Sequence, residues 1–453
     1  MINYRNKILY FLLILISNTM YSQELWSLDD CVKYAIEHNL QLNDFKYNQD
    51  ANKETYRQSI RNLLPSINAS ADYIKNFGRS PNPNTNIFEN NEFVSNAYQL
   101  NAQIDLFRGF QKVNTIKATK LLYSATNEET LQQKYLLAFR VMSAFYDIQF
   151  MEGLLTISKE QEKVSQNNYD LVKKQVEIGQ KAKADVYEAE SALLADQLLV
   201  TQNENNIIAA KLSLIQEMNL KGTTDISILS STIETNENEV DLQKDKDSIF
   251  AKAESFIPII KAQELRAKAA KRQLAVERGN LYPSLSLFAG YGSRYVDNGI
   301  NDDTGEVIPF NTQIKDNAAQ FFGVSITIPI SNGWSNRSRV KQQKVAVMRA
   351  ENTFEIQKQE LYQLIQQLVQ EGTALETEYQ QSSQRMKAQI LAFDIAQKRY
   401  EKGLISAIEL NQSKNVLANS QNENLQVQLR LKVNESTLDF YKGLPVFNIN
   451  RTQ

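Results

Sequence analysis

The stretch Tyr400-Glu-Lys-Gly-Leu-Ile-Ser-Ala-Ile-Glu-Leu410 places a single glycine between two segments that otherwise have the composition of helices. A second copy of this pattern, Val176-Glu-Ile-Gly-Gln-Lys-Ala-Lys-Ala-Asp-Val186, lies 224 positions earlier. The alignment pairs Gly179 with Gly403, Ala182 with Ser406, and Asp185 with Glu409. Because glycine readily adopts the left-handed conformation that a helix end commonly requires, both stretches are predicted to be turns between two helices.

The repeat extends over most of the chain. Asn62-Leu-Leu-Pro-Ser-Ile-Asn-Ala-Ser-Ala-Asp-Tyr73 matches Asn280-Leu-Tyr-Pro-Ser-Leu-Ser-Leu-Phe-Ala-Gly-Tyr291, 218 positions later. Self-similarity at a nearly constant offset, 218 to 224 positions, predicts tandem units of one architecture. We assign a first repeat to residues 23–221, a polar connecting segment to 222–244, a second repeat to 245–443 and a short tail to 444–453.

The N-terminus has the pattern of an export signal. Arg5 and Lys7 precede the apolar run Ile8–Ile16, which is too short to cross a bilayer as a helix. Residues 1–22 are therefore predicted to be a signal peptide, and no later segment has the length and apolarity of a transmembrane helix. The net charge of −2, without a basic run, gives nucleic-acid binding no electrostatic support.

The residues needed for common catalytic and metal sites are scarce. Cys31 is the only cysteine and His38 the only histidine, so His clusters and intrachain disulfides are excluded. Both residues lie seven apart on one predicted helix, where packing is the expected role. We predict no enzyme activity, no metal site and no cofactor.

Each repeat is predicted to contain a helix, two strands, a long helix and a further helix, in that order. The strands show strict alternation of apolar and polar residues, which is typical of a sheet with one apolar face. The β-hairpins span about residues 66–107 and 284–331, with polar loops at Lys75–Asn96 and Ser293–Asn317. The predicted apolar face consists of Ile67, Ala69, Ala71, Tyr73, Tyr98, Leu100, Ala102, Ile104, Leu106, Leu285, Leu287, Ala289, Tyr291, Phe322, Val324, Ile326, Ile328 and Ile330.

Two interpretations of these hairpins are open. They could lie on the core of a soluble protein, or they could cross a membrane, since a tilted strand needs roughly 9–11 residues to do so. Four strands are too few for a closed membrane barrel, and lipid does not tolerate open sheet edges. If the hairpins enter a membrane, several copies of the chain must therefore share one barrel, with two copies giving eight strands and three copies twelve.

Long proline-free segments follow each hairpin. Residues Phe110–Ile178 and Trp334–Lys402 each could form one helix of roughly 100 Å at 1.5 Å per residue. Apolar residues recur in steps of four and three, which is typical of a coiled-coil seam. These positions are Leu137, Val141, Ala144, Ile148, Met151 and Leu155, then Leu361, Ile365, Leu368, Gly372, Leu375 and Tyr379. The returning helices are predicted at Ala184–Leu220 and Ala407–Tyr441.

This combination resembles the TolC-type outer-membrane efflux channels over nearly the whole chain. The resemblance rests on the tandem repeats, the helix-Pro-Ser-strand junctions and the two G-x-x-[small]-x-x-[DE] tips. It implies an α+β membrane protein: a homotrimer whose 12-stranded barrel in the outer-membrane lipid of a Gram-negative bacterium continues as an α-helical barrel in the periplasm. It also implies that the tips meet a periplasmic adaptor protein, which links the channel to an inner-membrane pump of the RND or ABC type.

The resemblance also implies roles for the tip residues. The adaptor would contact Gly179, Ala182, Gly403, Leu404 and Ser406, while Asp185, Glu409 and Gln412 would line the periplasmic aperture. Gln412 replaces a second acid that the family carries there, which puts a doubled carboxylate ring in doubt. Asp185 and Glu409 could instead cap the returning helices, where negative charge is favoured. By analogy with the family, Arg399 and Tyr400 could form a latch between neighbouring helices.

Two other functions compete with an exit channel. A periplasmic adaptor also uses long helical hairpins, but it needs a Gly-rich β-domain around one hairpin. A soluble coiled-coil scaffold would explain the heptads but not the hairpins placed at one end of each repeat. The cargo is not identified by these residues.

Overall fold

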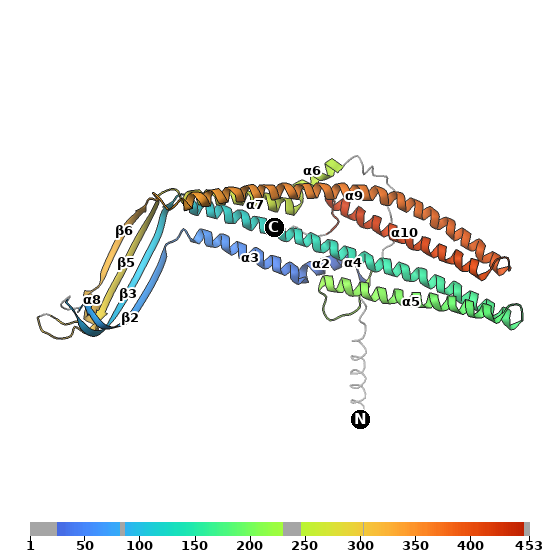
Figure 1. Cartoon of the computed structure of the whole chain (residues 1–453), viewed down its shortest axis with the longest axis horizontal. Coiled ribbons are helices and arrows are strands. Elements are labelled where there is room, and N and C mark those ends of the chain that lie inside the picture. The colour runs from blue at the N-terminus through green and yellow to red at the C-terminus, as the bar shows by residue number, and fades with distance from the viewer. Residues whose placement is uncertain (1–24, 82–86, 230–245, 302, 448–453) are drawn as a thin grey trace, which may run out of the picture. The chain divides into compact units, whose positions relative to one another are not determined.

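The computed structural model describes residues 25–81, 87–229, 246–301 and 303–447. It divides into a helical unit (residues 1–46, 129–260 and 357–453) and a strand-bearing unit (residues 47–128 and 261–356). The predicted signal peptide lies outside the described residues, as do residues 230–244 of the polar segment and 448–453 of the tail. The chain is mostly helical, with one main sheet (Figure 1).

The strand-bearing unit contains an antiparallel sheet in the order β2-β3-β5-β6. The strands are β2 (Ser66–Pro81), β3 (Phe88–Arg108), β5 (Ser284–Val296) and β6 (Ala319–Thr327). Strands β2 and β5 begin directly after Pro65 and Pro283. The helices before them, α3 (Leu40–Arg61) and α7 (Pro258–Gly279), end a few residues earlier, because proline disfavours helix in the residue that precedes it.

The register confirms the predicted apolar face within the paired strands, whereas Ile328 and Ile330 lie beyond the end of β6. Ile67 lies opposite Ala102, Ala102 opposite Ala289, and Ala289 opposite Phe322, so one row of small and apolar residues crosses all four strands. Residues directly opposite one another in an antiparallel pair project from the same face. Within the single chain this face is largely uncovered, with Phe322 74% and Ile326 66% exposed.

A β-bulge changes the end of this face. Asp105 lies opposite Ser286, but the next pairing joins Phe107 to Leu285, which leaves Leu106 as the extra residue. A bulge shifts the alternation by one position. Phe107, which lies opposite Leu285, therefore also belongs to the apolar face, although strict alternation did not include it.

The predicted loops at the other end of the hairpins are also partly wrong. Strands β2 and β3 extend into the predicted loop Lys75–Asn96 from its two ends, with pairing as far as Pro81 opposite Phe88. Backbone hydrogen bonds extend a ladder whatever the polarity of its side chains, and a Lys75–Glu92 ion pair supports this part. The second predicted loop contains a short helix, α8 (Phe310–Asp316).

The long helices have almost the predicted bounds. Helix α4 covers Gln111–Glu177 and α9 covers Ser335–Glu401, 67 residues each. Each follows a glycine and an aromatic residue that both have positive φ: Gly109 and Phe110 at 55° and 60°, and their counterparts Gly333 and Trp334 at 61° and 63°. Both strand–helix junctions are thus built with the same unusual backbone.

The helical unit contains α2 (Leu28–His38), α5 (Lys183–Met218), α6 (Lys246–Phe256) and α10 (Ala407–Tyr441), with most of α4 and part of α9. Strand β1 (Leu25–Trp26) pairs in parallel with β4 (Ser227–Ile228). The predicted heptad seam is confirmed, since all its positions are buried or half-buried, and Ile148 in the first series and Ile365 in the second are completely buried. The core of this unit therefore lies along the seam.

Two smaller features complete the helical unit. The ring of Phe440 contacts those of Tyr135, Phe139, Phe256 and Phe447, which holds the described part of the tail against α4 and α6. Cys31 is fully buried, and burial raises the pKa of its thiol to about 12, so its predicted packing role is confirmed.

Among the described helices, none is long and apolar enough to span a bilayer.

Candidate functional site

The tips of the two helical hairpins have the predicted glycine turns. At the first tip Gly179 has φ 77°, its N–H donates to Val176 O, and Gln180 N–H donates to Gln175 O. At the second tip Gly403 has φ 71°, its N–H donates to Tyr400 O, and Leu404 N–H donates to Arg399 O. Both are Schellman motifs, in which glycine supplies the left-handed residue and two backbone N–H groups satisfy the last carbonyls of the helix.

The residues after the turns differ between the tips. Ser406 Oγ accepts the N–H of Glu409 at 3.2 Å, and the Glu409 carboxylate accepts the N–H of Ser406 at 2.8 Å, a complete capping box at the start of α10. At the start of α5 the Asp185 carboxylate accepts the N–H of Ala182 at 3.0 Å. Ala182 has no side-chain oxygen, so only half of the box can form there. Both acids therefore cap helices.

Exchanging serine and alanine between the two caps should destabilise the first turn of α10 and stabilise the first turn of α5. We expect Ser406→Ala to weaken the first turn of α10 by about 1 kcal/mol and Ala182→Ser to strengthen that of α5 by a similar amount. Amide hydrogen exchange in these two turns measures both effects. Equal exchange in Ser406→Ala and the parent chain would show that the capping box does not stabilise the turn.

The structure brings most predicted aperture and adaptor residues to the surface of the tips. Leu404, Ser406, Glu409 and Gln412 are exposed, whereas Asp185 is half-buried. Leu404 is 63% exposed and Ile178, at the other tip, 68%. The cap occupies one oxygen of Glu409 and leaves its side chain on the surface, so a capping role is compatible with a second role in an assembled channel.

Tyr400 joins the two hairpins through a residue that sequence reasoning missed. Its hydroxyl lies 3.2 Å from Lys181 Nζ, which also stands 5.0 Å from the centre of the Tyr400 ring. Tyr400 is buried, while the other predicted latch residue, Arg399, is exposed and forms no ion pair with the described residues. The latch function of both residues stays a prediction.

A buried polar cluster lies farther along the same hairpins. Lys414 of α10 pairs with Asp196 of α5, and its Nζ donates to Ser165 Oγ of α4 at 2.7 Å. Lys414 is 4% and Asp196 9% exposed. The sequence signal was a lysine four residues after Leu410, which is itself buried, a spacing that places both on one helix face. Among the described residues no group of three or more His, Cys, Asp or Glu could hold a metal ion.

Comparison with known proteins agrees with this architecture. The sequence pattern of the outer membrane efflux protein family matches residues 32–219 and 252–444. The chain is 22% identical over 343 residues to the outer membrane protein TolC of Vibrio cholerae, covering 74% of this chain and 72% of the relative. It is also 22% identical over 433 residues to the probable efflux pump outer membrane protein TtgC of Pseudomonas putida, covering 92% and 82%.

Solved structures show the same fold. CusC aligns with a TM-score of 0.76 at 17% identity, covering 94% of this chain and 96% of that one. The outer-membrane channel OprN aligns with a TM-score of 0.75 at 16% identity, covering 92% and 89%. With the family pattern spread over both repeats, the chain belongs to the outer membrane efflux protein family, whose members are outer-membrane channels and not enzymes.

Proposed function

We propose that three copies of the chain close one barrel and form a passive exit duct through the outer membrane. The observation that carries this proposal is the four-stranded sheet with an apolar face and two unpaired edges, β2 and β6. Because lipid supplies no hydrogen-bond partners, these edges must pair with those of other copies. Eight strands leave an interior filled by side chains, so an open duct favours three copies over two.

The tips are the proposed meeting point with a periplasmic adaptor, which would couple the duct to an inner-membrane pump of the RND or ABC type. Support comes from the exposed Leu404 and Ile178, since apolar side chains on a surface favour contact with a partner. The relative TtgC is described as part of an efflux pump. A soluble scaffold or a periplasmic adaptor does not fit a family of outer-membrane channels.

Fractionation and planar-bilayer recording test the duct directly. The mature chain is expected in the outer-membrane fraction as a trimer that conducts ions after reconstitution. A soluble monomer would refute the proposal, and a stable dimer would refute its stoichiometry. Co-purification of an adaptor that depends on Leu404, with Leu404→Asp as the variant, tests the role of the tips.

At the aperture we propose that three copies of Glu409 gather around the axis and bind cations. A divalent ion about 5 Å from one carboxylate in water gains roughly 1.7 kcal/mol, so removing the three charges should weaken divalent-cation block about tenfold or more. Glu409→Gln and Glu409→Ala are therefore expected to raise conductance in the presence of divalent ions. Single-channel recording over a range of Mg²⁺ concentrations measures the change.

Two variants separate the charge from the cap. Glutamine at position 409 can still accept the Ser406 N–H, so Glu409→Gln removes the charge and keeps the cap. Ser406→Ala weakens the cap and keeps the charge. If divalent-cation block of the channel changes only in Ser406→Ala, or in neither variant, Glu409 acts only as a helix cap.

A further inference from the structure

We infer that the strand-proximal ends of α4 and α9 form a binding site for anionic phospholipid headgroups. Each end carries what we call an interfacial unit: an aromatic residue with lysines seven and ten positions later. The units are Phe110, Lys117 and Lys120 in the first repeat and Trp334, Lys341 and Lys344 in the second. This inference rests on the proposed insertion of the sheet into a membrane and names a lipid class that would surround it.

The aromatic residues continue the apolar face of the sheet. The bulge places Phe107 on that face, and the Phe107 ring makes an edge contact with the Phe110 ring at 5.2 Å between centres. In the second repeat Trp334 lines a hollow of about 330 Å³ together with Ile330, which is 94% exposed. Phe110 and Trp334 are 66% and 65% exposed. Exposed rings at the end of lipid-facing strands suit the bilayer–water interface.

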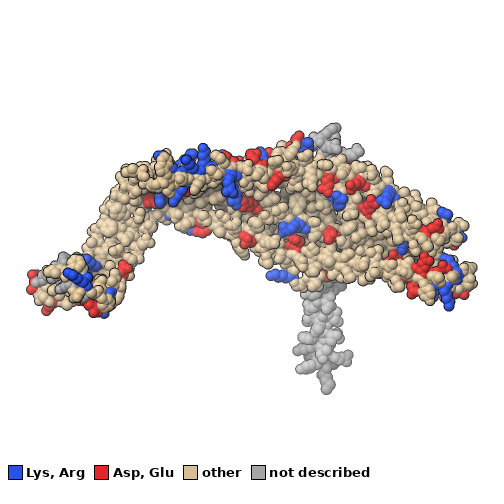
Figure 2. All heavy atoms as spheres, viewed as in Figure 1, with Lys and Arg blue, Asp and Glu red and all other residues tan. Residues whose placement is uncertain are grey.

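Cations follow these rings on one side of the helix. Arg337, Lys341 and Lys344 are spaced by four and three residues, which places them on one face of α9. The Arg337 guanidinium lies 4.3 Å from the centre of the Trp334 ring. Residues 335–350 include five cations and no carboxylate, and residues 111–127 include three cations and no carboxylate. Figure 2 shows Lys and Arg side chains gathered near the beginning of α9.

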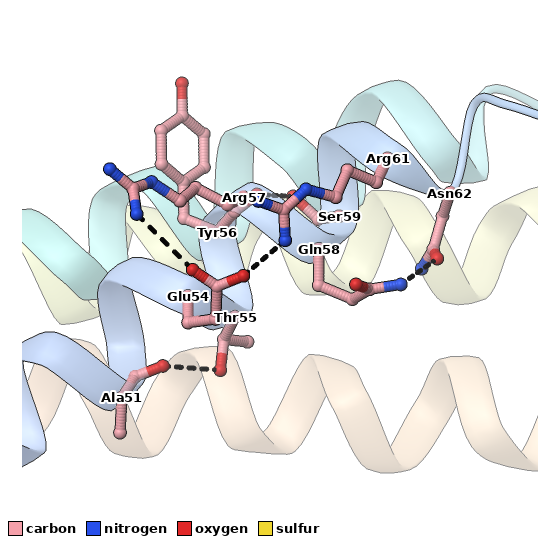
Figure 3. Close-up of polar contacts among 9 residues, drawn as sticks. All are labelled: Ala51, Glu54, Thr55, Tyr56, Arg57, Gln58, Ser59, Arg61 and Asn62. Carbon is pink, nitrogen blue, oxygen red and sulfur yellow. Dashed lines mark hydrogen bonds and ion pairs between the residues drawn. The ribbon is translucent and has the colours of Figure 1, made fainter.

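These cations have no anionic partner in the part of the chain that the structure describes. Arg337, Lys341, Lys344, Lys117 and Lys120 are all exposed, and none of the described ion pairs includes them. The neighbouring helix α3 is different, because Glu54 holds both Arg57, at 3.5 Å, and Arg61 (Figure 3). Unpaired cations are thus a property of the interfacial units and not of every helix that leads to the sheet.

The spacing fits a headgroup layer. The polar region of a bilayer is about 5–8 Å thick on each side, and a further 8–10 Å lies within one Debye length of it. From Arg337 to Lys344 the helix rises about 10 Å. All three side chains therefore lie either among the lipid phosphates or within one Debye length of them, where the negative potential of the headgroups still attracts cations. Because residues 335–350 contain no carboxylate and none of the described ion pairs includes these three cations, they favour headgroups with net negative charge over zwitterionic ones.

Quenching of Trp334 fluorescence by brominated lipids tests the inference in the full-length mature chain. Trp26→Phe removes the only other tryptophan. Vesicles of phosphatidylcholine contain an equal mole fraction of either brominated phosphatidylglycerol or brominated phosphatidylcholine. We expect phosphatidylglycerol to be enriched at Trp334 about fivefold or more, and the enrichment to vanish near 1 M salt.

Two double variants of α9 provide the comparison. Arg337→Gln with Lys341→Gln should abolish the enrichment. Arg339→Gln with Arg349→Gln removes the same charge from other faces of the helix and should leave the enrichment intact. Equal quenching by both lipids in the parent chain, or equal loss in both double variants, would overturn the inference. Failure to insert or conduct would instead refute the proposed function, whereas a conducting trimer without lipid preference would refute this inference alone.

Discussion

Lys414→Met is expected to destabilise the packing of α10 against α4 and α5 by about 3–5 kcal/mol. The lysine is 4% exposed and provides the only cation that the described structure places on the Asp196 carboxylate. Its removal leaves that carboxylate buried with Ser165 Oγ as its remaining described partner. A buried charge without a counter-ion costs far more than the net worth of the pair.

The opening free energy of α10 around position 414, obtained from amide hydrogen exchange, measures this effect. Arg385→Met is the matched control, because Arg385 pairs with Glu423 at 2.6 Å between α9 and α10 while both side chains are about half exposed. An exposed pair is worth at most about 1 kcal/mol. A loss in Lys414→Met no larger than in Arg385→Met would contradict the assignment of a buried pair.

A second variant separates charge from packing. Lys414→Met with Asp196→Leu removes both partners and is expected to recover most of the stability, since buried ion pairs replaced by apolar residues of similar size are often neutral or better. The pair would then serve to align the two hairpins. Failure of the double variant to recover would show instead that the cluster stabilises the fold through its hydrogen bonds.

Gly109→Ala is expected to cost several kcal/mol and to reduce the yield of assembled protein sharply. A Cβ atom at this position would lie 2.3 Å from the carbonyl oxygen of Gly279, a backbone atom that cannot move aside alone. The φ of 55° adds about 1–2 kcal/mol for any residue with a side chain. Thermal stability of the purified protein and its amount in the outer membrane measure the effect.

The second repeat supplies the control for this substitution. Gly333 has φ 61°, yet a Cβ atom there would have no atom within 4 Å. Gly333→Ala should therefore show only the cost of positive φ, about 1–2 kcal/mol. Equal losses in Gly109→Ala and Gly333→Ala would show that the close approach of Gly109 to Gly279 does not matter for stability.

Local patterns predicted the elements of this protein well. The bounds of α10 agree with the prediction, and those of α4 and α9 agree within one residue at each end. The glycine turns were also predictable, because Gly179 and Gly403 interrupt long helical segments at equivalent positions. In each case the determining interactions lie within a few residues along the chain.

The errors occur where the structure depends on a neighbouring strand. The bulge at Leu106, which adds Phe107 to the apolar face, is seen only in the pairing of β3 with β5, about 180 residues away in sequence, and alternation within β3 alone carries no sign of it. The extension of β2 to Pro81 and of β3 back to Phe88 likewise comes from pairing between backbones. The polar composition of these residues indicated a loop. This prediction was wrong because composition contains no information about a partner strand.

By itself, the sequence determined the tandem repeat, the order of helices and strands, the apolar face of the sheet and the turns at the tips. Only the tertiary structure decided which side chains meet between hairpins: Lys181 with Tyr400, 219 positions apart, and Asp196 with Lys414, 218 positions apart. The physical reason is the distance along the chain between the residues that interact. Helix caps, turns and periodicity depend on residues within one or two turns, whereas these contacts depend on the relative rotation and register of helices that the whole seam packs together.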